Sequence, residues 1–202
     1  MTMTNYVPEH QTQPGHKYVT DFVERRAFGS VSISIDDKPM MTLVPFDVIR
    51  EGDEITDLRF HLPWSNPQSK VIEGKSATVS IWGADAFINP EWYDHENVAT
   101  WDYEFVSISG VCSMMNEDQL RALLEDLYTK FLPEKPINWE YASQYLDDIV
   151  GFTLEVNQVQ PVFKLSQNKS AASLEGVIAG LKNSDQLGDQ ALAQALRRFY
   201  QE

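Results

Sequence analysis

The stretch 30–49 reads SVSISIDDKPMMTLVPFDVI, and it sets the class of the fold. Val31, Ile33 and Ile35 alternate with serines, which is the two-residue period of a strand with one buried face. Two aspartates supply turn residues and the apolar run 40–49 follows, so the stretch predicts two antiparallel strands. Pro45 has no N–H to donate, which predicts an edge position, a bulge or the end of pairing there.

The same alternation recurs along the rest of the chain. Further strands are predicted over 58–62, 76–82, 105–114 and 152–156. A turn near Pro161 predicts that the last of these returns through 162–165 as a C-terminal hairpin. The stretch 83–100 is rich in Trp, Tyr, Asn, Asp and Pro, and reads as a long structured loop of the kind often associated with function.

Helical spacing of apolar residues marks the remaining segments. The clearest helix begins at Asn116, with Gln119 placed to complete a capping box, and Pro133 ends it. Other helices are predicted over 17–26, 141–150, 174–181 and 187–199.

These elements predict a mainly β fold with flanking helices. Six to nine strands would form an antiparallel barrel, because the strands do not alternate regularly with helices as they do in a doubly wound parallel sheet. We expect one domain over 1–182 with a helical insertion near 116–150, followed by a C-terminal helix over 183–202.

Composition excludes several classes of protein. The chain has 202 residues, 43% of them hydrophobic, which is enough for one well-filled core. Its net charge of -14 repels phosphate backbones, so we expect no direct nucleic-acid partner. Cys112 is the single cysteine, which excludes an intrachain disulfide. The first ten residues lack a signal-peptide pattern and no long apolar run follows, so we expect a cytoplasmic protein with no membrane partner.

The common catalytic signatures are absent. No GxGxxG, P-loop, HExxH, GxSxG or CxxC pattern occurs. His95 stands among acidic residues of 91–96, where a solvated acidic loop is favoured over a metal site, and we expect no metal. Cys112 lies on an apolar strand and reads as a small buried hydrophobe.

Four stretches combine polar side chains with aromatic or cationic ones. They are 61–68, 82–93, 100–103 and 164–168. The last reads KLSQN and places a cation, a hydroxyl and two amides at a strand end, just before a helix that Ser170 can start. This mixture suits an anion or an amide-rich ring, and the alternative is a plain strand-to-helix turn with Ser and Asn as caps.

Several of these blocks together resemble a known family. They read GADAFINPEWY at 83–93, TWDY at 100–103, and IVGF at 149–152 followed by KLSQN at 164–168. In order and spacing they resemble the PaiB-type FMN-binding negative transcriptional regulators, from about Tyr6 to Leu181. The resemblance implies an FMN-binding split barrel, an antiparallel six-stranded Greek-key-like barrel, which is usually a homodimer with flavin at the subunit interface.

Flavin contacts follow from the resemblance and from the residue types. The predicted cofactor-binding residues are His61, Trp64, Asn66, Trp101, Lys164, Ser166, Gln167 and Asn168. Lys164 would provide a point charge for the FMN phosphate, and Trp101 would offer a stacking face. No catalytic acid or base can be named.

The chain departs from the family pattern at several positions. Leu43 stands in a TLVP stretch where the family commonly reads Asn-His-Leu-Pro. Trp64 stands where an Arg is usual, Ser69 where a Trp is usual, and Asp102 where an Asn is usual. Losing an Arg and gaining an Asp both weaken the attraction for a phosphate. Three functions therefore stay open: an FMN-binding regulator that acts indirectly on transcription, a flavin-dependent reductase or oxidase, and a degenerate member that keeps the dimer without the flavin.

Overall fold

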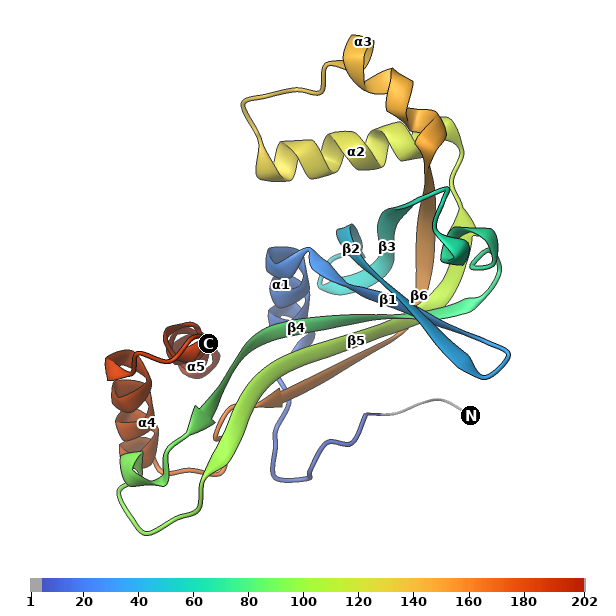
Figure 1. The fold of residues 1–202 in the computed structure, drawn as a ribbon. Coiled ribbons are helices and arrows are strands. Elements are labelled where there is room, and N and C mark those ends of the chain that lie inside the picture. Colours follow the sequence, from blue (N-terminus) through green and yellow to red (C-terminus); the bar gives the residue numbers. More distant parts are fainter. Residues whose placement is uncertain (1–4, 202) are drawn as a thin grey trace. The chain divides into compact units, whose positions relative to one another are not determined.

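The computed structural model describes residues 5–201, and within that range it contains six strands and five α-helices (Figure 1). The strands are β1 (Phe28–Ile35), β2 (Lys38–Glu51), β3 (Glu54–Pro63), β4 (Ser76–Ile88), β5 (Thr100–Met114) and β6 (Ile149–Lys164). The α-helices are α1 (His16–Arg26), α2 (Glu117–Phe131), α3 (Trp139–Ala142), α4 (Ala171–Asn183) and α5 (Asp189–Gln201). Three short 3₁₀ helices join them: η1 (Pro67–Lys70), η2 (Pro90–Trp92) and η3 (Ser143–Asp148).

The six strands close into an antiparallel ring in the order β1-β2-β3-β6-β5-β4. Strand β2 changes its partner at Pro45. It pairs with β1 up to the opposed residues Phe28 and Pro45, and it pairs with β3 from Phe46 opposite Phe60 onward. Because proline offers no N–H, the change of neighbour falls where pairing is already weakened. The predicted six-stranded antiparallel barrel with flanking helices is confirmed.

Alternate residues of the strands fill the inside of the ring. Phe60 and Phe152 lie opposite each other on β3 and β6, both are fully buried, and their ring centroids are 5.9 Å apart. Burying such a side chain is worth about 1.5–3 kcal/mol. Gly110 on β5 permits a close approach to β6, because a Cβ there would lie 2.0 Å from the carbonyl oxygen of Glu155.

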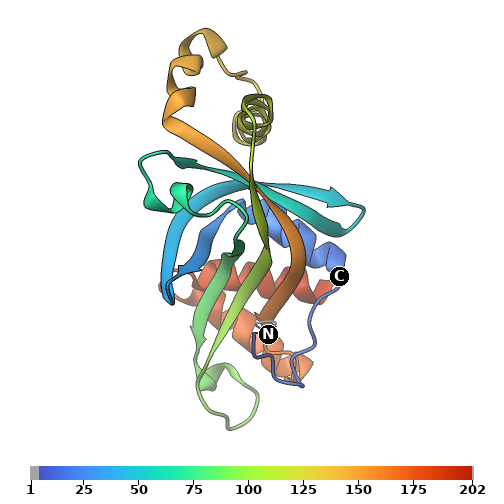
Figure 2. The same cartoon turned by 90° about the vertical axis from the view of Figure 1, so that its right-hand side faces the viewer.

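Helix α2 begins with the predicted capping box. The Asn116 side chain accepts a hydrogen bond from the Gln119 N–H, and the Gln119 side chain accepts one from the Asn116 N–H, both at 2.9 Å. Figure 2 shows α2 nearly end-on, beside the segment formed by α3 and η3. These elements share a small apolar cluster made of Met115, Leu120, Leu123, Leu124, Leu127, Leu146 and Ile149.

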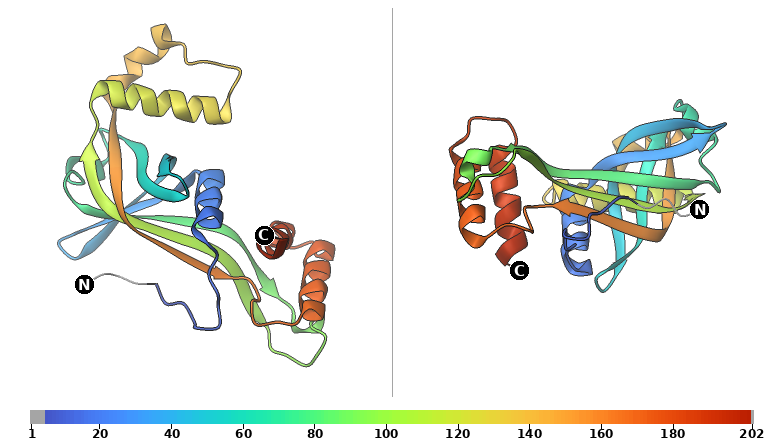
Figure 3. Two further views of the ribbon diagram at one scale, coloured as in Figure 1. Left: turned by 180° about the vertical axis from the view of Figure 1, so that it is seen from behind. Right: turned by 90° about the horizontal axis from the view of Figure 1, so that it is seen from below.

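Helices α4 and α5 pack against each other, and both end-of-chain helices are confirmed (Figure 3). Helix α4 begins at Ser170, whose side chain accepts a hydrogen bond from the Ser173 N–H at 3.1 Å. It also packs on η2 through two glycines. A Cβ at Gly180 would lie 2.2 Å from the Trp92 ring, and one at Gly176 would lie 2.1 Å from the Trp92 carbonyl oxygen.

Three boundaries predicted from the sequence are wrong. Strand β6 runs unbroken to Lys164, so no hairpin forms at Pro161, which removes only one donor from the ladder. Strand β4 continues to Ile88, because Ala86 and Ile88 keep the alternation of buried residues, and the structured loop shrinks to 89–99. The helix predicted over 141–150 ends as η3 at Asp148, since the β-branched Ile149 and Val150 pair with β3.

Contacts divide the described chain into two compact units. We call residues 16–81 and 107–159 the barrel unit, and residues 5–15, 82–106 and 160–201 the pocket unit. The predicted domain limits at 1 and 202 lie outside the described residues, and the boundary at 182 stays a prediction. Within residues 5–201, no helix is long and apolar enough to cross a bilayer.

Candidate functional site

A pocket of about 210 Å³ lies within the pocket unit. The N-terminal arm contributes His10 and Gln11, and the loop after η2 contributes residues 93, 97 and 98. The first residues of β5 and the turn from β6 into α4 complete the wall with residues 100, 102, 164 and 166–169. The lining is mostly polar and includes two lysines and one aspartate.

Lys164, at the end of β6, is held by three oxygen atoms. Its Nζ lies 2.5 Å from the Thr100 Oγ1, 2.5 Å from the Trp101 carbonyl oxygen and 3.2 Å from the Asp102 Oδ1. The ammonium group is therefore fixed in place, and a carboxylate already balances its charge. Less of that charge remains for a ligand than the sequence alone suggested.

Asp102 is the buried partner in this pair, with its side chain only 1% exposed. The Ser166 hydroxyl donates to the Asp102 Oδ2 at 2.5 Å. Burial raises the pKa of Asp102, while Ser166 and Lys164 act in the opposite direction. Ser166 reaches the carboxylate from a backbone with φ = 58°, a left-handed conformation that usually costs a residue other than glycine about 1 kcal/mol or more.

The charge of Asp102 contributes to raised pKa values of two tyrosines. Burial and the Asp102 charge raise the pKa of Tyr200 to about 12, and its hydroxyl donates to the Leu165 carbonyl at 3.0 Å. The same two causes raise the pKa of Tyr93, with the Ser166 hydroxyl partly offsetting them. Both hydroxyls therefore remain protonated at neutral pH and can act as donors.

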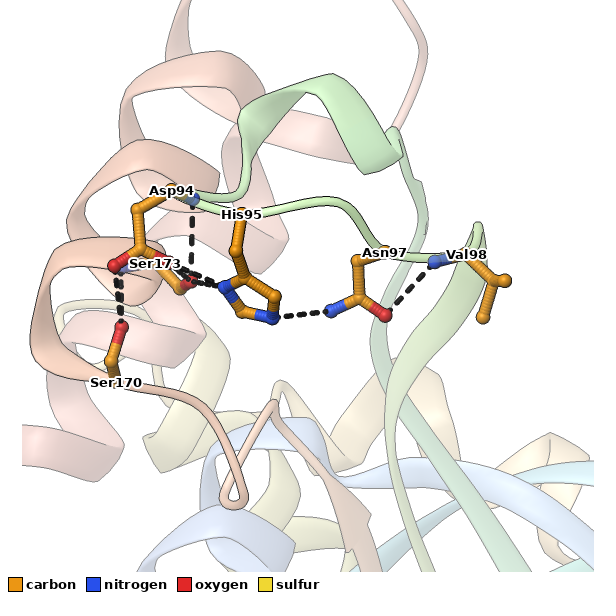
Figure 4. A network of polar contacts seen from close by, with 6 residues as sticks. All are labelled: Asp94, His95, Asn97, Val98, Ser170 and Ser173. Atoms are coloured by element: carbon orange, nitrogen blue, oxygen red, sulfur yellow. Dashed lines mark hydrogen bonds and ion pairs between the residues drawn. The ribbon is translucent and has the colours of Figure 1, made fainter.

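The loop that carries Tyr93 is tied to the start of α4 (Figure 4). The Asp94 carboxylate accepts hydrogen bonds from the hydroxyls of Ser170 and Ser173 and contacts the His95 Nδ1 at 2.7 Å. These bonds, chiefly the one from Ser173, lower the pKa of Asp94 to about 2. Asn97 continues the chain with its Nδ2 3.3 Å from the His95 Nε2. Asp94, one of the acidic residues beside His95, thus fastens the loop to α4.

A second polar region, residues 61–70 with Thr42, lies in the barrel unit. The Thr42 hydroxyl donates to the Gln68 Oε1 at 2.6 Å and accepts from the Asn66 Nδ2 at 2.9 Å. The fully buried Gln68 also donates to the Val31 carbonyl at 3.2 Å. Asn66 caps η1 by accepting from the Gln68 N–H. These groups satisfy one another.

His61 and Trp64 flank that network without joining it. Burial lowers the pKa of His61, and its buried Nδ1 has no hydrogen-bond partner among the described residues. Lys70, at the end of η1, places its Nζ 4.2 Å from the centroid of the Trp64 ring, which is a cation–π distance.

Trp101 is half exposed and is fixed by its neighbours in the pocket unit. Its Nε1 donates to the Asp85 carboxylate at 3.0 Å, and its ring meets the Phe87 ring edge-on at 6.2 Å. Its carbonyl oxygen serves Lys164, but its side chain does not line the pocket.

The structure brings four of the eight predicted cofactor residues together in one pocket: Lys164, Ser166, Gln167 and Asn168. The other four lie outside it, Trp101 in the pocket unit and His61, Trp64 and Asn66 in the barrel unit.

Sequence reasoning missed several pocket residues. Tyr93 and Thr100 end and begin two of the quoted blocks, so their position carried a signal. Lys169 directly follows the KLSQN block, so its position next to a quoted block also carried a signal. Gln11 comes from the polar arm, where no local pattern marks a function.

The described residues offer neither a cluster of metal-ligating side chains nor a reactive cysteine. In the described range 5–201, no group of three or more His, Cys, Asp or Glu side chains could hold a metal ion. Cys112 is buried, and burial raises the pKa of its thiol to about 12, so little thiolate is present at neutral pH.

Comparison with known proteins agrees with this architecture. Residues 5–158 match the family described as "Putative FMN-binding domain". The chain is 29% identical over 199 residues to the Protease synthase and sporulation protein PAI 2 of Bacillus subtilis (strain 168), which covers 95% of this chain and 96% of that protein.

Two solved structures share the fold. The FAD and heme binding protein of Mycobacterium smegmatis has a TM-score of 0.61 at 17% identity, covering 82% of this chain and 78% of that one. A conserved hypothetical protein from Mycobacterium tuberculosis has a TM-score of 0.59 at 12% identity, covering 81% and 92%. The closed six-stranded ring and the match over residues 5–158 together show that this chain is a PaiB-like member of the FMN-binding-domain family.

Proposed function

We propose that this protein binds FMN, forms a homodimer and acts indirectly in the negative regulation of transcription. The observation that supports flavin binding best is the polar pocket, where two lysines, three side-chain hydroxyls and four side-chain amides gather in about 210 Å³. Whole-ligand pockets usually measure about 300–1,000 Å³. The pocket therefore suits the phosphate end of FMN better than the complete molecule.

The two lysines would have different roles toward the phosphate. Lys164 is fixed but paired with Asp102, whereas Lys169 forms no ion pair with a carboxylate in residues 5–201. The Lys169 Nζ lies 4.8 Å from the centroid of the Tyr93 ring. Lys169 would supply most of the net positive charge, while Asn168 would donate amide hydrogens. Gln167 would border the ligand, because its Nε2 already donates to the carbonyls of Thr12 and Phe163. Bound flavin would supply redox chemistry, and the protein would position and tune it.

The four predicted residues outside the pocket remain proposed flavin contacts. Trp64 and Trp101 would offer ring faces for stacking, and neutral His61 and Asn66 would offer polar edges. Substituting each of these four residues in turn and measuring flavin affinity tests its contact separately from those of the pocket.

The regulatory role is proposed from the family and from charge. The Bacillus subtilis relative is named for protease synthesis and sporulation. A net charge of -14 opposes binding to DNA, so an effect on transcription would pass through another molecule. A cytoplasmic location is proposed because the chain has a single cysteine and so no intrachain disulfide.

Exposed apolar side chains in the barrel unit support the homodimer. Phe28, Met41 and Leu43 on β1 and β2 are 52%, 62% and 60% exposed. A second copy would remove them from water. Light scattering should give about twice the chain mass of 23.1 kDa, and a value near 23.1 kDa at micromolar concentration would contradict the dimer.

Titration with FMN and riboflavin tests the flavin proposal. Removing a hydrogen bond to a charged group costs about 1.5–3 kcal/mol, or about one to two orders of magnitude in affinity. We expect losses of that size for FMN in Lys169→Ala and in Lys164→Ala, where Asp102 is also left without its cation. Riboflavin, which has no phosphate, should lose little in Lys169→Ala.

The exposed Lys75→Ala, which removes the same charge in the barrel unit, serves as the control and should bind both flavins like wild type. A wild-type protein that binds neither flavin would overturn the proposal in favour of a degenerate member. Consumption of NAD(P)H by the flavin-loaded protein would indicate a reductase instead of a binding protein.

A further inference from the structure

Two buried polar atoms in the pocket have no hydrogen-bond partner among the described residues. They are the Gln11 Oε1 and the Tyr93 hydroxyl, on residues that are 6% and 8% exposed. A buried polar group without a partner costs about 1–3 kcal/mol. Both residues line the same pocket, so one ligand could satisfy both atoms.

Gln11 is held in place by its own segment of chain. Its N–H donates to the Pro8 carbonyl at 2.9 Å, and its carbonyl accepts from the Gln13 Nε2 at 2.9 Å. Gln13 in turn pairs with the backbone of Phe163, accepting at 2.8 Å and donating at 3.2 Å. The arm is thereby fastened to the end of β6, and the side chain of Gln11 enters the pocket wall from a fixed backbone.

Tyr93 is equally well positioned. The neighbouring Trp92 fits against two glycines of α4, and Asp94 binds both serines at the start of that helix. The Ser166 hydroxyl near Tyr93 donates its proton to Asp102 and so cannot donate to the Tyr93 oxygen. The Tyr93 O–H itself has no acceptor among the described residues, so it can donate to a ligand, and the Lys169 ammonium group lies over the same ring.

The chemistry of these groups narrows the ligand. Gln11 offers an acceptor, Tyr93 offers a donor, and Lys169 offers a positive charge. A sugar-like hydroxyl both donates and accepts, so a chain of hydroxyls can serve the first two while a phosphate serves the third. A cationic ligand fits poorly, because the carboxylate of the pocket is already engaged with Lys164 and Ser166.

We propose that the pocket recognises a phosphorylated polyol chain, with one hydroxyl on Gln11, another on Tyr93 and the phosphate on Lys169. The chain could belong to FMN, whose ribityl phosphate has this composition, or to a free sugar phosphate. The first source rests on the proposed flavin function, and the second does not.

Calorimetric titration with four probes separates these sources. FMN carries the whole chain with its phosphate, riboflavin the chain alone and lumiflavin neither, while ribose 5-phosphate is a phosphorylated sugar without a flavin ring. Each probe is titrated into wild type, Tyr93→Phe, Gln11→Leu and Lys169→Ala. Tyr145→Phe, at an exposed tyrosine of the barrel unit, is the control for loss of a hydroxyl.

One neutral hydrogen bond is worth about 0.5–1.5 kcal/mol, or roughly 2- to 12-fold in affinity. We expect Tyr93→Phe and Gln11→Leu each to weaken FMN and ribose 5-phosphate by such a factor. Riboflavin should weaken equally, while lumiflavin and all titrations of Tyr145→Phe should match wild type. Lys169→Ala should weaken only the two phosphorylated probes. Thermal midpoints check that each variant is folded.

The outcomes separate this inference from the proposed function. If wild type binds ribose 5-phosphate but no flavin, the flavin proposal fails and the inference stands. If wild type binds FMN but Tyr93→Phe and Gln11→Leu, both folded, bind it unchanged, only the inference fails. If wild type binds none of the four probes, both are wrong.

Discussion

The turn 164–169 in the pocket unit and the segment 61–70 in the barrel unit are both rich in polar side chains, yet they use them differently. In the barrel unit, Asn66, Gln68 and Thr42 bond to one another and to the backbone. In the pocket unit, the charges of Lys164 and Asp102 are paired, but Gln11 and Tyr93 keep unused polar atoms.

This difference in hydrogen-bond satisfaction indicates which groups can contribute to the binding of a ligand. A polar group that is already satisfied gains little from a ligand, whereas an unsatisfied buried group gains the full value of a new hydrogen bond. Two stretches of similar composition can therefore differ in how many of their polar groups are free to bind a ligand.

The largest expected effect is a difference in the free energy of unfolding between variants of two buried glutamines. Gln68→Leu should lower the free energy of unfolding by about 2 kcal/mol, because it strands the Val31 carbonyl and the Thr42 hydroxyl. Gln11→Leu should instead raise it by about 1 kcal/mol, because it removes a buried oxygen that has no partner. Chemical denaturation of both variants measures the two values. Equal losses would show that the two regions do not differ as described.

An intermediate effect concerns the charge balance of the pocket. Asp102→Asn removes the carboxylate that opposes Lys164 and should bind FMN and ribose 5-phosphate about tenfold more tightly, or about 1.4 kcal/mol. Lumiflavin affinity should not change. Asp147→Asn, an equal change of charge at an exposed site, is the control. Unchanged phosphate affinity in Asp102→Asn would mean that the ion pair does not limit Lys164.

The smallest expected effect is on the pH dependence of stability, and it is due to His61 in the barrel unit. Burial lowers the pKa of His61 below the value of about 6.5 in an unfolded chain. Below about pH 6.5 the unfolded chain therefore takes up a proton that the folded protein resists. The stability due to neutral His61 is complete above this pH and is lost as the pH falls toward the lowered folded pKa, by at most about 1.4 kcal/mol per pH unit.

His61→Gln should accordingly flatten the dependence of stability on pH between 7.5 and 5.5. Asp21→Asn is the contrasting variant. The hydrogen bond from Lys17 lowers the pKa of Asp21, so its contribution is present above the unfolded value of about 3.9 and is lost as the pH falls through the lowered folded value. Its difference from wild type should stay constant between pH 5.5 and 7.5. Parallel curves for wild type and His61→Gln would contradict the role of His61.

Local patterns of the sequence determined most of the architecture. The alternation in 30–49, the capping box at Asn116 and the apolar spacing in the last two helices each depend on neighbours along the chain, and each was predicted correctly. The family could be identified for the same reason, because its blocks are contiguous. Boundaries were wrong where a distant strand decided them, as at Pro161, where β6 continues.

Only the tertiary structure decided how the polar residues are used. Asp102 and Lys164 are 62 positions apart, and the fold alone brings them to 3.2 Å and balances their charges. Gln11 and Tyr93 share one pocket although 82 positions of sequence separate them, and no local pattern could mark either as unsatisfied. The sequence determines which side chains are polar through their chemistry, but hydrogen-bond satisfaction depends on distance and burial, which exist only once the chain has folded.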